Sequence, residues 1–240
     1  MSISLKEKTY DMIKNKIISC EYAPNTYINE KQLCEELNVS RTPVRDALSR
    51  LEHEQLVTII PKKGVLVSPI TIHEINNIFE ARLLFEPYII SKYGTRIDED
   101  ILNRLHELLS TYKSNIDNES IAFLADDEFH QILIELCKNK YLIQLHSKIY
   151  SQNARVRIMS GNFKKERLID THNEHCEIVE HLVKMDYQKA AKAMHNHLQS
   201  AKDAAFKTIF DNETVFVNQN TLDLKNETTF NNDTEIDSNI

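Results

Sequence analysis

Four side chains in the second half of the chain have types and spacing suited to binding a metal ion. Asp126 and His130 lie four residues apart in DDEFH, so on a helix they share one face, which also carries the apolar Phe123 and Leu133. A carboxylate and an imidazole that both point into a core are unfavourable unless they are paired or bound to a metal. This spacing can bring both groups onto one ion.

Two later helical segments each place one histidine on an apolar face and another on a polar face. His175 aligns with apolar neighbours and His181 with charged ones, whereas in the last segment His197 lies among alanines and His195 among polar residues. The candidate metal ligands are therefore Asp126, His130, His175 and His197, with His172 in reserve. Such a set suits a divalent transition ion. The alternative is that each histidine only hydrogen-bonds a neighbouring carbonyl or another polar group.

A second group of polar side chains, in the first 69 residues, has the spacing of a DNA-binding motif. Asn29 and Ser40 are each placed to cap a helix, and the second of these helices is expected from about Arg41 to Glu54. Two short strands joined by PKKG follow, which completes a helix-turn-helix with a hairpin. The start of the second helix of such a motif enters the major groove.

Several residues of this segment would then face DNA. The candidates are Ser40, Arg41, Thr42 and Arg45 at the helix start and Lys62, Lys63 and Gly64 at the hairpin tip, where glycine permits a positive φ. An ordinary solvated helix face is the alternative for the two arginines. The co-occurrence of capped helix, turn and basic hairpin favours DNA binding.

The pattern of apolar residues predicts a mainly α protein. Helical spacing followed by two strands indicates a winged helix-turn-helix over residues 1–69, and helical spacing almost without interruption indicates an all-helical antiparallel bundle over residues 70–210. Residues 211–240 are acidic and rich in Asn, without a sustained period, which predicts a disordered tail.

Composition narrows the class of protein. The net charge of −7 comes mostly from the tail, so it does not argue against DNA binding. The sequence has no apolar run of about 18 residues, which predicts a cytoplasmic protein without a membrane span. The four cysteines form no CxxC pair and are expected to be free thiols.

The segment SRTPVRDALSRLEHEQLV and the hairpin PKKGVLV resemble the winged helix-turn-helix of the GntR family of bacterial transcriptional regulators. The resemblance implies DNA contacts by Lys31, Ser40, Arg41, Thr42, Arg45 and Gly64. Lys31 replaces a common arginine, which keeps a phosphate contact but loses the bidentate fork.

The segments DDEFH, NEHCEIVEHL and AMHNHL resemble the metal motif of the FCD domain, which is attached to many GntR regulators of the FadR type. This resemblance implies the same four ligands, an ion that is zinc, nickel or manganese, and a small organic acid as effector. Arg82 matches an arginine often seen at the start of these domains, which implies that it binds the effector. Arg155 and Arg157 are weaker candidates, and the alternative for all three is a helix-surface arginine.

Together these features predict a metabolite-responsive transcriptional regulator, most simply a repressor, and not an enzyme. A homodimer on a palindromic double-stranded operator is expected, because one recognition helix reads too few base pairs. Two alternatives stay open. One is a metal sensor, and the other is a metal-dependent enzyme fused to a DNA-binding domain, for which Glu86 could serve as the general base.

Overall fold

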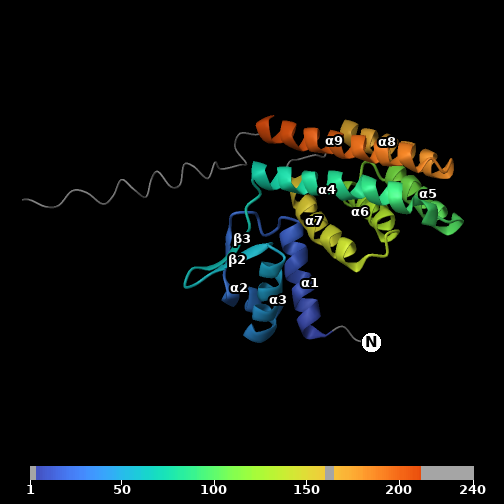
Figure 1. Cartoon of the computed structure of the whole chain (residues 1–240). Coiled ribbons are helices and arrows are strands. Elements are labelled where there is room, and N and C mark those ends of the chain that lie inside the picture. Colours follow the sequence, from blue (N-terminus) through green and yellow to red (C-terminus); the bar gives the residue numbers. More distant parts are fainter. Residues whose placement is uncertain (1–3, 160–164, 212–240) are drawn as a thin grey trace, which may run out of the picture.

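A computed structural model describes residues 4–159 and 165–211 of the chain (Figure 1). The amino-terminal elements are α1 (Leu5–Ile18), β1 (Tyr27–Ile28), α2 (Glu30–Leu37), α3 (Arg41–His53), β2 (Val57–Ile60) and β3 (Gly64–Val67). The helical part comprises α4 (Ile72–Tyr93), the short 3-10 helix η1 (Gly94–Arg96), α5 (Glu99–Ser114), α6 (Glu119–Glu135), α7 (Lys140–Met159), α8 (Lys165–Val183) and α9 (Tyr187–Asp211). The mainly α fold class is therefore confirmed. The predicted acidic tail lies outside the described residues, except for Asp211.

The amino-terminal elements form a winged helix-turn-helix around their own apolar core. Ile13 and Ile17 of α1 pack with Leu33 of α2 and Leu48 of α3, and all four are almost fully buried. The sheet has the order β1-β3-β2 with antiparallel pairing. The sequence predicted only β2 and β3, because the two residues of β1 are too few to show a period.

The two predicted caps have different outcomes. The Asn29 side chain accepts a hydrogen bond from the Lys31 amide at 2.8 Å, as predicted for the start of α2. Ser40 occupies the cap position of α3, but its side chain makes no capping hydrogen bond, so that part of the prediction was wrong. The positive backbone φ predicted for Gly64 is confirmed, since its φ is +114° and a Cβ there would lie 3.0 Å from the Ile28 carbonyl oxygen.

The remaining helices form a bundle in which α9 packs against both α4 and α8 (Figure 1). Its core includes Phe129 and Leu133 of α6, Ile178 of α8 and Leu198 of α9. Each helix contributes one apolar stripe, so the histidines that share these stripes are carried into the interior. Among the described residues, no helix is both long enough and apolar enough to cross a membrane.

Helix α7 joins the winged helix-turn-helix to the bundle through hydrogen bonds to backbone carbonyls. The Gln152 amide donates to the Gln55 carbonyl at 3.1 Å, and the Arg155 guanidinium donates to the Ser68 carbonyl. Arg155 is 0% exposed and also donates to the Gln152 side chain at 2.7 Å. Burial lowers the pKa of Arg155 to about 10, which leaves it protonated at neutral pH.

Close packing against Tyr187 requires glycine at position 94, where α4 ends. A Cβ built on Gly94 would lie 2.4 Å from Cδ1 of the Tyr187 ring, although its φ of −55° suits any residue. Gly94→Ala is therefore expected to reduce the free energy of unfolding by about 1–3 kcal/mol through overpacking, measured by urea titration. In a Tyr187→Ala background the same substitution should cost less than in the wild type, because the clashing ring is gone. A Gly94→Ala variant as stable as the wild type would contradict the overpacking.

Candidate metal centre and nucleic-acid interface

The four predicted metal ligands come together inside the bundle. Asp126 and His130 of α6, His175 of α8 and His197 of α9 each offer one ligand atom, and these atoms all lie within 4.8 Å of one another. All four residues are buried. His175 Nε2 lies 3.4 Å from His197 Nε2 and 3.5 Å from Asp126 Oδ1. The inward orientation predicted from periodicity is confirmed for each residue.

Two glutamates orient two of these histidines. His130 Nδ1 lies 2.7 Å from Glu86 Oε2, and His197 Nδ1 lies 2.7 Å from Glu174 Oε2. The simplest assignment is that each ring donates its Nδ1 proton to the carboxylate and turns the Nε2 lone pair toward the cluster. Metal-binding histidines are commonly held in this way.

The donor set fits a divalent transition ion. His130 Nε2 is buried and has no hydrogen-bond partner among the described residues, and it lies 4.0 Å from Asp126 Oδ1. An unpartnered imidazole nitrogen in a core is unfavourable. Three imidazole nitrogens and one carboxylate oxygen are ligands that zinc, nickel and manganese accept. A bound ion would satisfy His130 Nε2.

The surroundings keep Asp126, His130 and His175 in the protonation states that metal binding requires. Burial lowers the pKa of His130 and of His175 well below its usual value, so both rings are neutral. Burial is the largest influence on Asp126 and would raise its pKa, but the Arg157 guanidinium, the His130 and His197 rings and Arg82 together outweigh it, so the net shift of the pKa is downward. The Asp126 carboxyl and the His130 and His175 rings are thus deprotonated at neutral pH, so no proton has to be displaced from these three groups when the ion binds.

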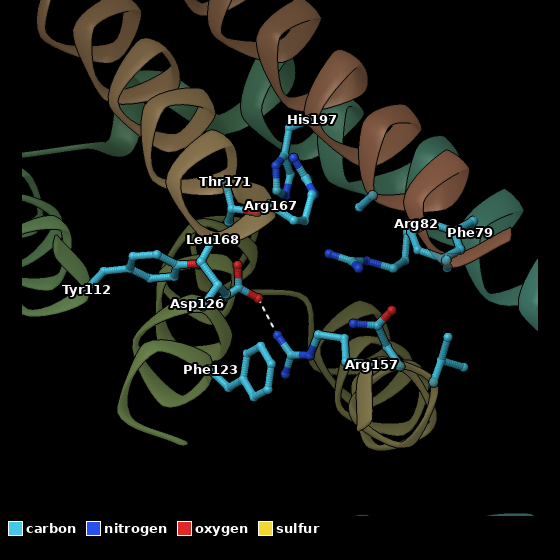
Figure 2. Close-up of a pocket in the computed structure, with 14 residues that line it drawn as sticks. Phe79, Arg82, Tyr112, Phe123, Asp126, Arg157, Arg167, Leu168, Thr171 and His197 are labelled. Carbon is cyan, nitrogen blue, oxygen red and sulfur yellow. Dashed lines mark hydrogen bonds and ion pairs between the residues drawn. The ribbon is translucent and has the colours of Figure 1, made fainter. Parts of the chain in front are cut away.

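A cavity lined by three arginines adjoins the cluster. Figure 2 shows Arg82, Arg157, Asp126 and His197 around this cavity, with Arg167 beside His197. Aromatic and polar side chains complete the lining, among them Phe79, Tyr112, Phe123, Asn153 and Thr171. The cavity therefore combines positive charge with a candidate metal.

Each arginine of the cavity already has a carboxylate partner. Arg82 Nε donates to Glu86 Oε1 at 2.6 Å, and Arg157 Nη1 donates to Asp126 Oδ2 at 2.5 Å. Arg167 forms two hydrogen bonds with Glu174, at 2.8 and 2.9 Å. Arg82, the arginine matched to the family, and Arg157, a weaker candidate, lie beside the metal candidate, whereas Arg167 was missed.

Other candidates lie elsewhere. Arg155 faces the winged helix-turn-helix and does not line this cavity. His172 is half-buried beside Cys176, outside the four-residue cluster. His146, which the sequence reading did not single out, is 1% exposed, and burial lowers its pKa to about 4.

Glu86 is fully engaged. Its Oε1 accepts from Arg82 and its Oε2 from His130, so both oxygens already have partners. A general base needs an oxygen that can reach the substrate proton. The enzyme alternative therefore loses its candidate base.

Five of the eight predicted DNA-contacting residues, Lys31, Arg41, Lys62, Lys63 and Gly64, line one groove of the winged helix-turn-helix. A groove between the start of α2, the start of α3 and the wing is lined by Asn29, Glu30, Lys31, Arg41 and residues 59–65, which include Lys62, Lys63 and Gly64. Arg41, Thr42 and Arg45 are exposed at the start of α3. Arg45 Nε donates to Glu30 Oε2 at 2.9 Å.

A winged helix-turn-helix fused to a helical bundle with a buried Asp and His cluster defines a class of DNA-binding transcriptional regulators. Residues 5–67 match the family described as bacterial regulatory proteins, gntR family, and residues 77–200 match the FCD domain. The chain therefore belongs to the GntR family of regulators, in the FadR-type branch that carries an FCD domain.

Curated relatives support this assignment. The HTH-type transcriptional repressor RspR of Escherichia coli (strain K12) is 27% identical over 204 residues, which cover 83% of this chain and 88% of RspR. The HTH-type transcriptional repressor GlaR of the same strain is 28% identical over 199 residues, 79% of this chain and 90% of GlaR. These relatives are transcriptional regulators and not enzymes.

Solved structures share the fold. E. coli McbR/YncC superposes with a TM-score of 0.76 at 16% identity, over 86% of this chain and 99% of that chain. A GntR transcriptional regulator from Rhodococcus sp. RHA1 gives a TM-score of 0.74 at 20% identity, over 85% of this chain and 99% of that chain.

Proposed function

We propose that this protein is a cytoplasmic repressor that binds a palindromic operator as a homodimer and responds to a small organic acid held beside a divalent metal. The buried cluster of Asp126, His130, His175 and His197, next to an arginine-lined cavity, carries the proposal. The ion would be zinc, nickel or manganese, held by these four side chains. It would supply a Lewis-acid anchor for a carboxylate oxygen.

The cavity favours an anionic ligand. Arg82, Arg157 and Arg167 supply three guanidinium groups, and the planar fork of arginine matches the two oxygens of a carboxylate. Tyr112 and Thr171 offer hydroxyl groups at the same cavity. An acid with additional polar groups could therefore be held at one end by arginine and at the other end by hydroxyl groups.

Helix α7 offers a route from this cavity to the DNA-binding domain. Asn153 and Arg157 line the cavity, while Gln152 and Arg155 of the same helix hold the carbonyls of residues 55 and 68. A ligand that moves or rigidifies α7 would change how the winged helix-turn-helix is held. The ligand must favour one arrangement over the other, because otherwise it shifts no equilibrium.

This route predicts that Arg155→Met separates ligand binding from the DNA response. Methionine keeps the apolar part of the buried stem but cannot donate to the Ser68 carbonyl. An operator is first selected from a random duplex pool with metal-loaded wild type, and small carboxylates are then screened by fluorescence anisotropy. We expect one acid to weaken operator binding roughly tenfold in the wild type. In Arg155→Met we expect the same acid to change operator binding by less than about twofold.

Two results would contradict the proposal. DNA affinity that follows metal concentration without any dependence on organic acids would favour the metal-sensing alternative. An Arg155→Met variant that responds as fully as the wild type would exclude the α7 route. Arg104→Ala serves as the control, because Arg104 is exposed on α5 and forms its ion pair with Glu128 of α6, not with α7 or the winged helix-turn-helix.

A further inference from the structure

One carboxylate lies in a groove that is otherwise positively charged. The residues that line the groove between α2, α3 and the wing carry four cationic side chains, Lys31, Arg41, Lys62 and Lys63, and a single carboxylate, that of Glu30. A carboxylate at a surface that approaches phosphates weakens DNA binding by repulsion. Another interaction is therefore expected to offset this repulsion.

The geometry around Glu30 indicates which interaction that is. Glu30 Oε2 accepts a hydrogen bond from Arg45 Nε at 2.9 Å, which joins the first residue of α2 to the first turns of α3. Arg45 has 64% of its side chain exposed and Glu30 has 33%, so the pair sits at the surface with the arginine projecting outward. An exposed pair of this kind contributes little to stability.

Glu30 engages the guanidinium of Arg45 at one nitrogen, Nε. Because Glu30 holds Nε, the edge of the guanidinium formed by Nη1 and Nη2 stays available for a second partner. Those two donors match the O6 and N7 acceptors of guanine in the major groove. A free arginine would lose rotamer entropy when it makes this contact, and an arginine already held at Nε loses less.

We propose that Glu30 is a specificity-determining residue that positions Arg45 to read a guanine with its two terminal nitrogens. The inference rests on the DNA-binding function and adds a residue that does not itself touch the base. It implies that Glu30 lowers the affinity for all DNA somewhat and increases the discrimination at one base pair of each half-site. The helix dipole also favours an acidic residue at the start of α2, but it does not affect base preference.

The test compares Glu30→Ala and Glu30→Gln with the wild type in full-length protein. Each protein selects duplexes from a random pool, and anisotropy then measures binding to the selected duplex and to its version with one guanine replaced in each half-site. We expect the wild type to prefer guanine at that position by about tenfold. Glu30→Ala should bind the two duplexes within about twofold, while Glu30→Gln should keep most of the preference because its amide oxygen still accepts from Nε.

The control and the opposing outcomes are distinct. Lys31→Ala, at the neighbouring position of the same groove, should weaken all duplexes alike and lower the salt slope by about one. Unchanged base preference in Glu30→Ala overturns the inference, as does a new preferred base in Glu30→Gln, which would mean that Glu30 reads the base itself. A wild type that selects no sequence overturns the operator-binding function along with it.

Discussion

Asp126→Ala and His197→Ala are each expected to lose tight binding of a divalent metal, whereas His195→Ala keeps it. Each of the first two removes one of four ligand atoms that lie within 4.8 Å of one another in the core. We expect a fall in affinity of roughly 100-fold or more, since even partners of the ligands commonly contribute 10–100-fold. The measurement is metal per chain by mass spectrometry after purification without chelator, with about one ion per wild-type chain expected.

His195 is the matched control because it lies on the same helix, two residues from His197, but faces solvent. Circular dichroism of all three variants verifies that they are folded. If the wild-type protein binds none of zinc, nickel and manganese, the four residues of the cluster serve only in core packing. Equal loss in His195→Ala would show that the metal is held elsewhere.

Arg41→Ala combined with Arg45→Ala should reduce operator binding by roughly 100-fold or more. Both side chains are exposed in the first turns of α3. In a helix-turn-helix, the amino-terminal end of the recognition helix enters the major groove. A bidentate arginine contact with a guanine contributes about 1–3 kcal/mol. Because the free energies of two lost contacts add, the two reductions in affinity multiply. Anisotropy on the selected operator measures the loss, and its salt dependence shows how many phosphate contacts are lost with it.

Arg104→Ala again supplies a control with a loss of positive charge outside the winged helix-turn-helix. It should leave operator binding within about twofold of the wild type, because surface charges beyond the Debye length are screened. A double variant that binds as well as Arg104→Ala would place the DNA-binding surface away from α3.

The four metal ligands were predictable because their helices are regular. A period of 3.6 residues separates His197 from His195 and His175 from His181, and the structure buries one of each pair while the other stays exposed or half-buried. The winged helix-turn-helix was predictable for a related reason, since caps, turn residues and strand lengths are local features.

What escaped prediction depends on contacts between distant segments. Glu86 orients His130 across 44 residues, and Glu174 orients His197 across 23, so neither pairing has a local spacing to reveal it. The capping hydrogen bond expected of Ser40 does not form, although the helix begins after it. A residue type can therefore mark a boundary correctly without making the bond that explains its preference.

The buried face of helix α7 could not be recognised from apolar periodicity, for a different reason. Its buried side contacts the other domain and the cavity as well as the bundle core, and it carries polar residues such as His146, Gln152 and Arg155. Apolar periodicity reveals the residues of a hydrophobic core, but it does not reveal polar residues that are buried in contacts between domains.

The acceptors of the hydrogen bonds from α7, the carbonyls of Gln55 and Ser68, belong to the main chain. Substitution of the side chain at either position leaves the carbonyl in place, as long as the backbone path is kept. These two hydrogen bonds therefore do not depend on which side chains the DNA-reading domain carries at positions 55 and 68. Substitutions in α3 and the wing could therefore change the operator preference while the hydrogen bonds to α7 and the response to the ligand are kept. The DNA-binding domain and the ligand-binding domain can in this way evolve separately.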